Sequence, residues 1–291
     1  MIVLTYDIGS TNIKLLILNI EKSGNDEKIE LISKVRERTT DFANFFYDNL
    51  VKYNIKKSDI EKIIVTGTGA SYLSDSIDGI DIIKVDEFTA IAYGGLLLSK
   101  LDEAIIVSIG TGTTILYTNL DKIERLGGTG LGGGTFVGLS NALLQKKLLD
   151  NNVKTFNELI EIAKKGDRRH IDLTIGDISK YDIANMSKDL TAANFAKMNK
   201  PYVEADLVAS VINLIIENIS LLVNSLNKNY KVVYIGTFVT DENIRRRLKE
   251  FSEYTGDDIV FVDNSDFVIA IGAWEYYLLK IREPLINNTS S

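Results

Sequence analysis

The order of apolar and polar positions along the first third of the chain predicts short strands that alternate with helices. Apolar runs bounded by polar or glycine residues indicate strands, and apolar positions that recur at helical spacing indicate helices. Strands are predicted at residues 2–6, 13–18, 28–35, 62–65 and 81–85, and helices at residues 41–53 and from residue 87 onward. The fourth strand ends in the turn Thr66-Gly67-Thr68-Gly69.

The second part of the chain repeats this opening. Strands are predicted at residues 104–109, 113–118 and 122–126, followed by a glycine-rich bend and a helix through residue 148. A β-β-β-α-β-α order that occurs twice predicts a duplicated α/β fold with its ligand in a cleft.

Residues 151–202 are less regular and more polar, and we interpret them as an insertion that covers the cleft. Residues 205–226 form a long helix that is apolar over most of its circumference, so it is buried on more than one side, as a core helix or as part of a dimer interface. Its one narrow polar stripe consists of Asp206, Ser210, Asn213, Glu217, Ser220 and Asn224. The chain then returns to α/β with a strand at 231–235, a turn at Gly236, a helix to residue 254, a strand at 258–262 and a helix at 266–280.

Composition narrows the class of protein. The 291 residues are 45% hydrophobic and 25% charged, which is typical of a soluble globular protein of about two domains. A net charge of −7 argues against a nucleic-acid partner, since such binding relies on Lys and Arg. No uninterrupted apolar run reaches bilayer length and the apolar start lacks a basic leader, so we expect a cytoplasmic protein without a membrane partner. The chain has no cysteine and one histidine, His170, which excludes thiolate metal sites and leaves no well-placed catalytic triad.

Two turns that combine glycines with hydroxyl side chains each lie between two apolar runs. The first reads Asp7-Ile8-Gly9-Ser10-Thr11-Asn12-Ile13-Lys14, and the second reads Ser108-Ile109-Gly110-Thr111-Gly112-Thr113-Thr114. Glycines let backbone N–H groups approach an anion, and the hydroxyls add further donors. Either turn alone is also what an ordinary hairpin contains. Their repetition favours a cradle for nucleotide phosphates, and therefore a phosphotransferase.

Phosphoryl transfer also needs a cation and a group that orients or deprotonates the attacking hydroxyl. Asp7 precedes the first turn, where it can hold Mg²⁺ directly or through water, or cap the turn. Glu87 begins a helix after a strand and is a candidate base, but with Asp86 as N-cap it is equally a favourable first-turn charge. Arg125 precedes the glycine-dense residues 127–134 and can stabilise a phosphoryl group, hold a substrate carboxylate, or be an ordinary surface arginine.

Taken in order, these residues and several later blocks resemble the type II pantothenate kinases, which belong to the superfamily of acetate and sugar kinases, heat-shock chaperone ATPases and actin. The resemblance covers nearly the whole chain. Its most specific blocks are Gly166-Asp167-Arg168 with Ile171-Asp172-Leu173, and Asp189-Leu190-Thr191-Ala192-Ala193-Asn194-Phe195. The phosphate turns by themselves would indicate only that the protein binds ATP.

The resemblance implies a duplicated ribonuclease-H-like fold, as in actin-like ATPases, with lobes at residues 1–100 and 101–291 and the active site in the cleft between them. It implies phosphorylation of pantothenate to 4'-phosphopantothenate with ATP and Mg²⁺, the first step of coenzyme A biosynthesis. It also implies a homodimer formed through the helix at 205–226.

Residue roles carry over by position from the same resemblance. Glu87 corresponds to the catalytic base, and Arg125 to a residue that contacts pantothenate or the developing charge. The implied nucleotide contacts are Asp7, Gly9, Ser10, Thr11, Asn12, Lys14, Gly110, Thr111, Gly112, Thr113, Gly132, Gly133, Gly134, Gly236, Thr237 and Phe238, with Asp7 also toward Mg²⁺. The implied substrate contacts are Glu87, Arg125, Gly128, Thr129 and Ala193.

The chain departs from the family pattern in two places. Ser10 stands where many members have a second glycine, and Thr237-Phe238-Val239-Thr240 replaces a small polar run, which leaves the adenine contacts open. Activators of 2-hydroxyacyl-CoA dehydratases share the opening motif but need cysteines for an iron–sulfur cluster, and sugar kinases of the repressor and kinase family usually bring a cysteine-rich zinc motif. The alternatives are therefore another small-molecule kinase or an ATPase regulator of the same superfamily.

Overall fold

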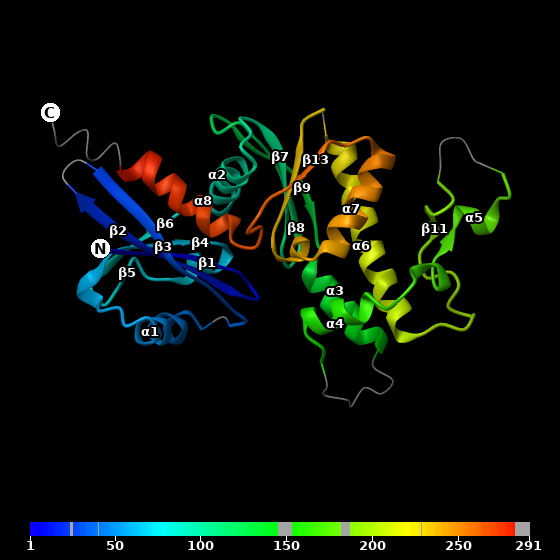
Figure 1. Ribbon diagram of the computed structural model, residues 1–291, viewed down its shortest axis with the longest axis horizontal. Helices are drawn as coiled ribbons and strands as arrows, with labels where there is room; N and C mark the ends of the chain where they lie inside the picture. Colours follow the sequence, from blue (N-terminus) through cyan, green and yellow to red (C-terminus); the bar gives the residue numbers. More distant parts are fainter. Residues whose placement is uncertain (24–25, 40, 145–152, 182–186, 228, 283–291) are drawn as a thin grey trace. The chain divides into compact units, whose positions relative to one another are not determined.

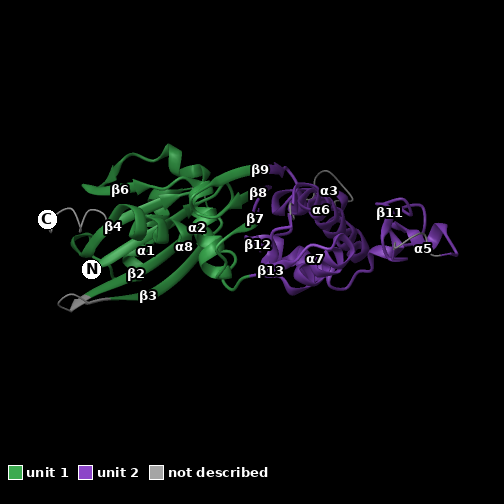
Figure 2. Cartoon of the chain, turned by 90° about the horizontal axis from the view of Figure 1, so that it is seen from above, with its two compact units in different colours: residues 1–106, 116–125, 262–291 green, residues 107–115, 126–261 purple. Residues whose placement is uncertain are grey.

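The computed structural model describes residues 1–23, 26–39, 41–144, 153–181, 187–227 and 229–282. The chain divides into two compact units, coloured separately in Figure 2: unit 1 holds residues 1–106, 116–125 and 262–291, and unit 2 holds residues 107–115 and 126–261. The sequence predicted a boundary between the two lobes near residue 100. Residues 116–125 and 262–291, which were expected in the C-terminal lobe, group with unit 1, and the C-terminal helix packs there on the first sheet.

Unit 1 is built on a six-stranded sheet with the order β3-β2-β1-β4-β6-β5. Its strands are β1 (Ile2–Ile8), β2 (Ile13–Ser23), β3 (Asp26–Glu37), β4 (Ile60–Thr66), β5 (Ser76–Ile77) and β6 (Ile80–Lys84). Its helices are α1 (Phe42–Lys52), α2 (Glu87–Ser99) and α8 (Val268–Tyr276). The sheet is antiparallel from β3 to β1 and parallel from β1 through β4 to β6.

Helices cover both faces of this sheet, with α1 on one side and α2 and α8 on the other (Figure 1). The Asp41 side chain accepts the Asn44 N–H and so begins α1, whose apolar side chains recur at helical spacing. Phe42 packs edge-on against Tyr6 of β1, with ring centroids 5.1 Å apart. Because successive side chains of a strand point to opposite faces, Tyr6 faces α1 and its neighbour Asp7 faces the other side of the sheet.

The second sheet has five strands in the order β13-β12-β7-β8-β9. They are β7 (Ala104–Ile109), β8 (Thr113–Thr118), β9 (Ile123–Thr129), β12 (Val232–Ile235) and β13 (Ile259–Phe261). Besides β12 and β13, residues 126–261 contain α3 (Gly133–Leu144), α4 (Phe156–Ala163), β10 (Leu173–Thr174), α5 (Ile175–Ile178), β11 (Thr191–Ala193), α6 (Glu204–Leu226) and α7 (Glu242–Thr255).

The two sheets confirm the predicted duplication. Read from its other edge, the second sheet runs β9-β8-β7-β12-β13, which matches β3-β2-β1-β4-β6 strand for strand. Each half therefore places a three-strand meander beside a parallel pair, as the repeated β-β-β-α-β-α pattern predicts. This is the duplicated α/β fold expected from the sequence.

The structure differs from the predicted elements mainly in the insertion and at helix ends. Within residues 151–202 it contains α4, α5 and the small β10–β11 sheet, which were too short to predict. The helix α3 is described over Gly133–Leu144, and the predicted extension to residue 148 lies outside the described residues. After α8 the chain continues as a π-helical turn, Tyr277–Arg282.

The helix α6 is the only one among the described residues whose length and hydropathy would allow it to cross a membrane. No uninterrupted apolar run of the sequence is as long as this helix, because a polar stripe divides the helix. In the fold, 61% of its most apolar window is buried inside the protein, as in the core helix of a globular domain.

Candidate functional site

The first predicted turn joins β1 to β2 in an antiparallel hairpin, as expected. Asp7 and Lys14 are directly opposite each other in its register, and the Lys14 Nζ donates to Asp7 Oδ2 at 2.9 Å. Both side chains are buried, so each charge depends on the other for compensation. Within the turn, the Gly9 N–H donates to the Asn12 carbonyl at 3.0 Å.

A third glycine-hydroxyl turn, Thr66-Gly67-Thr68-Gly69, lies directly against the first, because the parallel register pairs Asp7 with Thr66. A Cβ on Gly67 would lie 2.7 Å from Asp7 Oδ1 and from the Ile8 carbonyl oxygen, and Gly67 has a φ of +86°. Only glycine permits this approach. The sequence showed the turn but gave no reason to connect it with Asp7.

The same arrangement occurs at the equivalent place in the second sheet. Gly236 follows β12 as Gly67 follows β4, its φ is +105°, and a Cβ there would lie 2.4 Å from the Ile109 carbonyl oxygen at the end of β7. Both glycines are followed by a short 3₁₀ helix, Thr68–Tyr72 and Thr237–Thr240. The duplication therefore extends to the conformation of the loops.

Glu87 is the first residue of α2, and the Asp86 side chain caps that helix by accepting the Thr89 N–H at 3.0 Å. The Val85 N–H donates to the Val65 carbonyl, which continues the parallel pairing of β6 with β4 up to the start of this helix. Burial, followed by the charges of Asp7 and Asp86, raises the pKa of Glu87, and the Lys14 ammonium opposes this shift. Unit 1 thus brings Asp7, Lys14 and Glu87 into one electrostatic group, and a carboxylate with a raised pKa suits a general base.

Arg125 lies on β9 with an exposed side chain, as expected of either a ligand contact or a surface arginine. Ala193 lies on β11, where it pairs with Leu173 and is exposed. Gly128 and Thr129 lie at the end of β9, and the Thr129 hydroxyl accepts the Leu131 N–H at 3.2 Å.

The second predicted turn is packed against the start of α3. Gly133 and Gly134 donate their N–H groups to the carbonyls of Gly110 and Thr111, at 2.8 and 2.9 Å. Side chains at Gly132 or Gly134 would meet Thr111 atoms at 2.8 Å or less, which explains the glycine density of this loop. The N–H groups of Gly133 and Gly134 therefore stabilise the conformation of the turn that contains Thr111.

Phe238, predicted to contact the nucleotide, is a core residue by its side chain. The residue is 1% exposed, and its ring lies 6.0 Å from the Phe136 ring and 6.1 Å from the Phe156 ring. A ring packed in this way cannot stack on adenine, so any contact from this position would involve its backbone.

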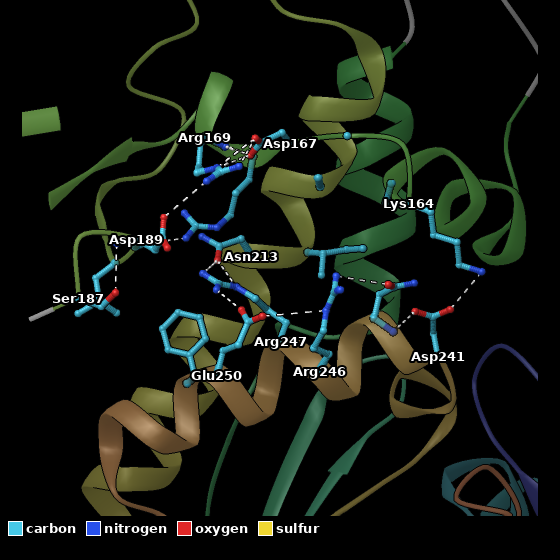
Figure 3. A pocket seen from close by; sticks show the side chains of 18 of the residues that line it. Lys164, Asp167, Arg169, Ser187, Asp189, Asn213, Asp241, Arg246, Arg247 and Glu250 are labelled. Carbon is cyan, nitrogen blue, oxygen red and sulfur yellow. Dashed lines mark hydrogen bonds and ion pairs between the residues drawn. The ribbon is translucent and has the colours of Figure 1, made fainter. Parts of the chain in front are cut away.

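Unit 2 also contains a cavity of about 650 Å³ between the insertion, α6 and α7. Its charged side chains pair with one another: Arg169 with Asp167 at 2.7 Å and Lys164 with Asp241 at 3.5 Å (Figure 3). None of the residues predicted for the nucleotide or the substrate lines this cavity. The charges of Arg169 and Lys164 are therefore compensated by carboxylates that line the same cavity.

Sequence comparisons show which known proteins this chain resembles. The model of the Fumble family matches residues 102–274. The type II pantothenate kinase of Bacillus cereus (strain AH820) is 29% identical over 275 residues, which cover 89% of this chain and 96% of that protein. The type II pantothenate kinase of Oceanobacillus iheyensis is 32% identical over 218 residues, which cover 71% of this chain and 79% of that protein.

Two solved structures share the fold. The activator of the 2-hydroxyisocaproyl-CoA dehydratase from Clostridium difficile, with bound ADPNP, superposes with a TM-score of 0.66 at 21% identity over 99% of this chain and 98% of that one. Component A of the Acidaminococcus fermentans (R)-2-hydroxyglutaryl-CoA dehydratase gives a TM-score of 0.61 at 20% identity, over 95% and 97% of the two chains. At such identities the likeness concerns the fold alone, and it is the actin-like ATPase fold expected from the sequence.

Proposed function

We infer that this chain, which belongs to the Fumble family, is a pantothenate kinase that uses ATP to phosphorylate pantothenate to 4'-phosphopantothenate, the first step of coenzyme A biosynthesis. The observation that carries this inference is the similarity to type II pantothenate kinases over nearly the whole chain. The dehydratase activators share the fold, but this chain has no cysteine to hold an iron–sulfur cluster.

In the mechanism we propose, the Glu87 carboxylate accepts the proton of the primary hydroxyl of pantothenate. The resulting oxygen attacks the γ-phosphorus of ATP, and ADP leaves. The raised pKa of Glu87 and its place at the start of α2 support this role. Arg125, exposed on β9, would neutralise charge on the transferred group or bind pantothenate.

We propose that the turns at Gly9 and Gly110 bind the phosphates and that the Gly236 turn binds adenosine. The described residues contain no group of three metal-ligating side chains, but a single carboxylate with substrate phosphates and waters is a usual ligand set for Mg²⁺. Asp7 fits that requirement. When bound, the ion neutralises charge on the β- and γ-phosphates.

We further propose a cytoplasmic homodimer that forms through the unburied face of α6. That face carries Leu221, which is 47% exposed, and the half-buried Leu214 about two turns earlier. Replacing Leu221 with lysine should convert the dimer to a monomer, as measured by light scattering.

The function is tested by ADP release with pantothenate, with N-acetylglucosamine and with no acceptor. Stimulation by pantothenate alone supports the kinase; stimulation by the sugar would indicate another small-molecule kinase, and equal release in all three would indicate an ATPase regulator. Replacing Glu87 with glutamine should lower turnover about a hundredfold or more, in line with general-base contributions, and leave ATP affinity unchanged.

Glu242 offers a matched control. It is also the first residue of a helix capped by an aspartate, Asp241, so Glu242→Gln removes the same charge from the same kind of position. Turnover of Glu242→Gln should equal that of the unmodified protein. If Glu87→Gln behaves like Glu242→Gln, then Glu87 serves only as a first-turn charge of α2.

A further inference from the structure

The polar stripe of α6 is not a solvent-facing stripe, because its first half lies beneath the insertion. Asp206, Ser210 and Asn213 are 3%, 0% and 1% exposed. Asp206 accepts the backbone N–H of Asp167 at 2.7 Å and lies 3.1 Å from the His170 Nδ1. The stripe is therefore the line along which α6 holds the insertion through hydrogen bonds.

Asp172 is the buried centre of this attachment. Its side chain is fully buried, Oδ1 accepts the Phe195 N–H at 3.0 Å, and Oδ2 accepts the Asn213 Nδ2 at 3.2 Å. Phe195 has a φ of +58°, a left-handed conformation that a non-glycine residue keeps only when its surroundings impose it. The bond from Asp172 supplies that constraint at one end of residues 191–195.

Asn213 holds the other end of the same segment. Its Nδ2 also donates to the Thr191 hydroxyl at 2.9 Å, and the Asn194 Nδ2 donates to Glu217 at 3.3 Å. Arg247 of α7 donates to Asn213 Oδ1 from Nε at 3.1 Å and from Nη2 at 2.7 Å, as the contact drawn in Figure 3 shows. Since the guanidinium fixes the amide oxygen, the amide nitrogen must face Asp172 and Thr191.

Residues 191–195 are therefore anchored on the side that faces α6. Thr191 and Asn194 bond inward to the stripe, whereas Ala192 and Ala193 between them are exposed. The anchoring atoms come from a carboxylate and an amide that are themselves buried and oriented, so the position of the two alanines is set by Asp172 and Asn213. Neither residue was singled out from the sequence as functional.

We propose that Asp172 and Asn213 are positioning residues for acceptor binding: they hold residues 191–195 so that Ala193 meets pantothenate at a fixed place. This rests on the proposed function and on the contact with the substrate that the resemblance implies for Ala193. The pair acts on binding of the acceptor and leaves the phosphate-binding turns and Glu87 unaffected.

The test replaces Asp172 with asparagine, whose amide brings a donor to a place where the protein already presents donors. The KM for pantothenate should rise at least tenfold, with kcat within threefold and the KM for ATP within twofold of the unmodified enzyme. Asp189→Asn is the matched control: it removes a negative charge from the same insertion, but its side chain is 68% exposed. It should change neither KM.

Hydrogen exchange at the Phe195 amide, measured on the free protein, provides a readout that does not depend on activity. Exchange should speed up at least tenfold in Asp172→Asn and remain unchanged in Asp189→Asn. If Asp172→Asn does not fold, Asn194→Ala removes only the bond to Glu217, and it should raise the KM for pantothenate at least threefold without changing kcat.

The outcomes distinguish the positioning role of Asp172 and Asn213 from the kinase assignment. Faster exchange with an unchanged KM for pantothenate would overturn the positioning role and leave the kinase assignment intact. Unchanged exchange would overturn the anchoring itself. An unmodified protein that is not stimulated by pantothenate would overturn the function, and the positioning role with it, whatever the exchange rates show.

Discussion

Replacing Gly67 with alanine tests the contact between the third turn and Asp7. Gly67 has φ +86° and ψ 166°, a region that is essentially restricted to glycine, so any side chain there costs about 1–3 kcal/mol in strain. The new Cβ would also lie 2.7 Å from Asp7 Oδ1 and from the Ile8 carbonyl oxygen. Overpacking of this kind adds about 1–3 kcal/mol. The total expected destabilisation is about 2–6 kcal/mol.

Gly79 provides the control for strain without contact. Its φ is +78°, and a Cβ there would meet nothing within 4 Å. Gly79→Ala should therefore cost only backbone strain, and Gly67→Ala should cost more, because it adds the steric contact with Asp7 and Ile8. The free energy of unfolding is measured by urea denaturation of both variants.

A second readout is the affinity for ATP in the presence of Mg²⁺, measured by calorimetry. Because the added methyl group pushes on Asp7 and Ile8 at the end of β1, Gly67→Ala should weaken this affinity whereas Gly79→Ala should not. Equal losses of stability in the two variants, with equal ATP affinities, would refute the close approach of Gly67 to Asp7.

Three further predictions concern single side chains. Since the pKa of Glu87 is raised and a base must be ionised to act, kcat/KM should fall toward acid with an apparent pKa above the ordinary glutamate value; a pH–rate profile measures this, and Glu87→Gln should lack that limb. Phe238→Ala should cost about 3–5 kcal/mol by denaturation, because the ring fills the core, with little change in ATP affinity of the folded fraction. Lys14→Met should destabilise unit 1 by about 3–5 kcal/mol by leaving Asp7 buried and unpaired, and adding Asp7→Asn should restore most of the loss; no restoration would argue against the ion pair.

The strands, the main helices and their repetition could all be predicted from the order of the residues. The apolar run of β1, the helical spacing in α1 and the glycine turns after β1 and β7 are local signals, because each can be recognised from residues that are neighbours along the chain. Helix starts were predictable for the same reason: Asp86 caps α2 and leaves Glu87 as its first residue. The resemblance to pantothenate kinases also rests on ordered blocks that a linear reading can find.

Which of these local features contact one another depends on how the chain folds. Phe238 follows a glycine turn that looks suited to a ligand, but Phe136 and Phe156, distant in sequence, bury its ring. The spacing of polar residues on α6 shows a stripe, and only the path of the insertion shows that Asp172 is bonded to it. Gly67 lies against Asp7 because β4 pairs with β1 in a particular register. Pairings of this kind bring together segments separated by tens of residues. Their free energy depends on surfaces that form only when the chain folds, so it cannot be judged from any single stretch of sequence.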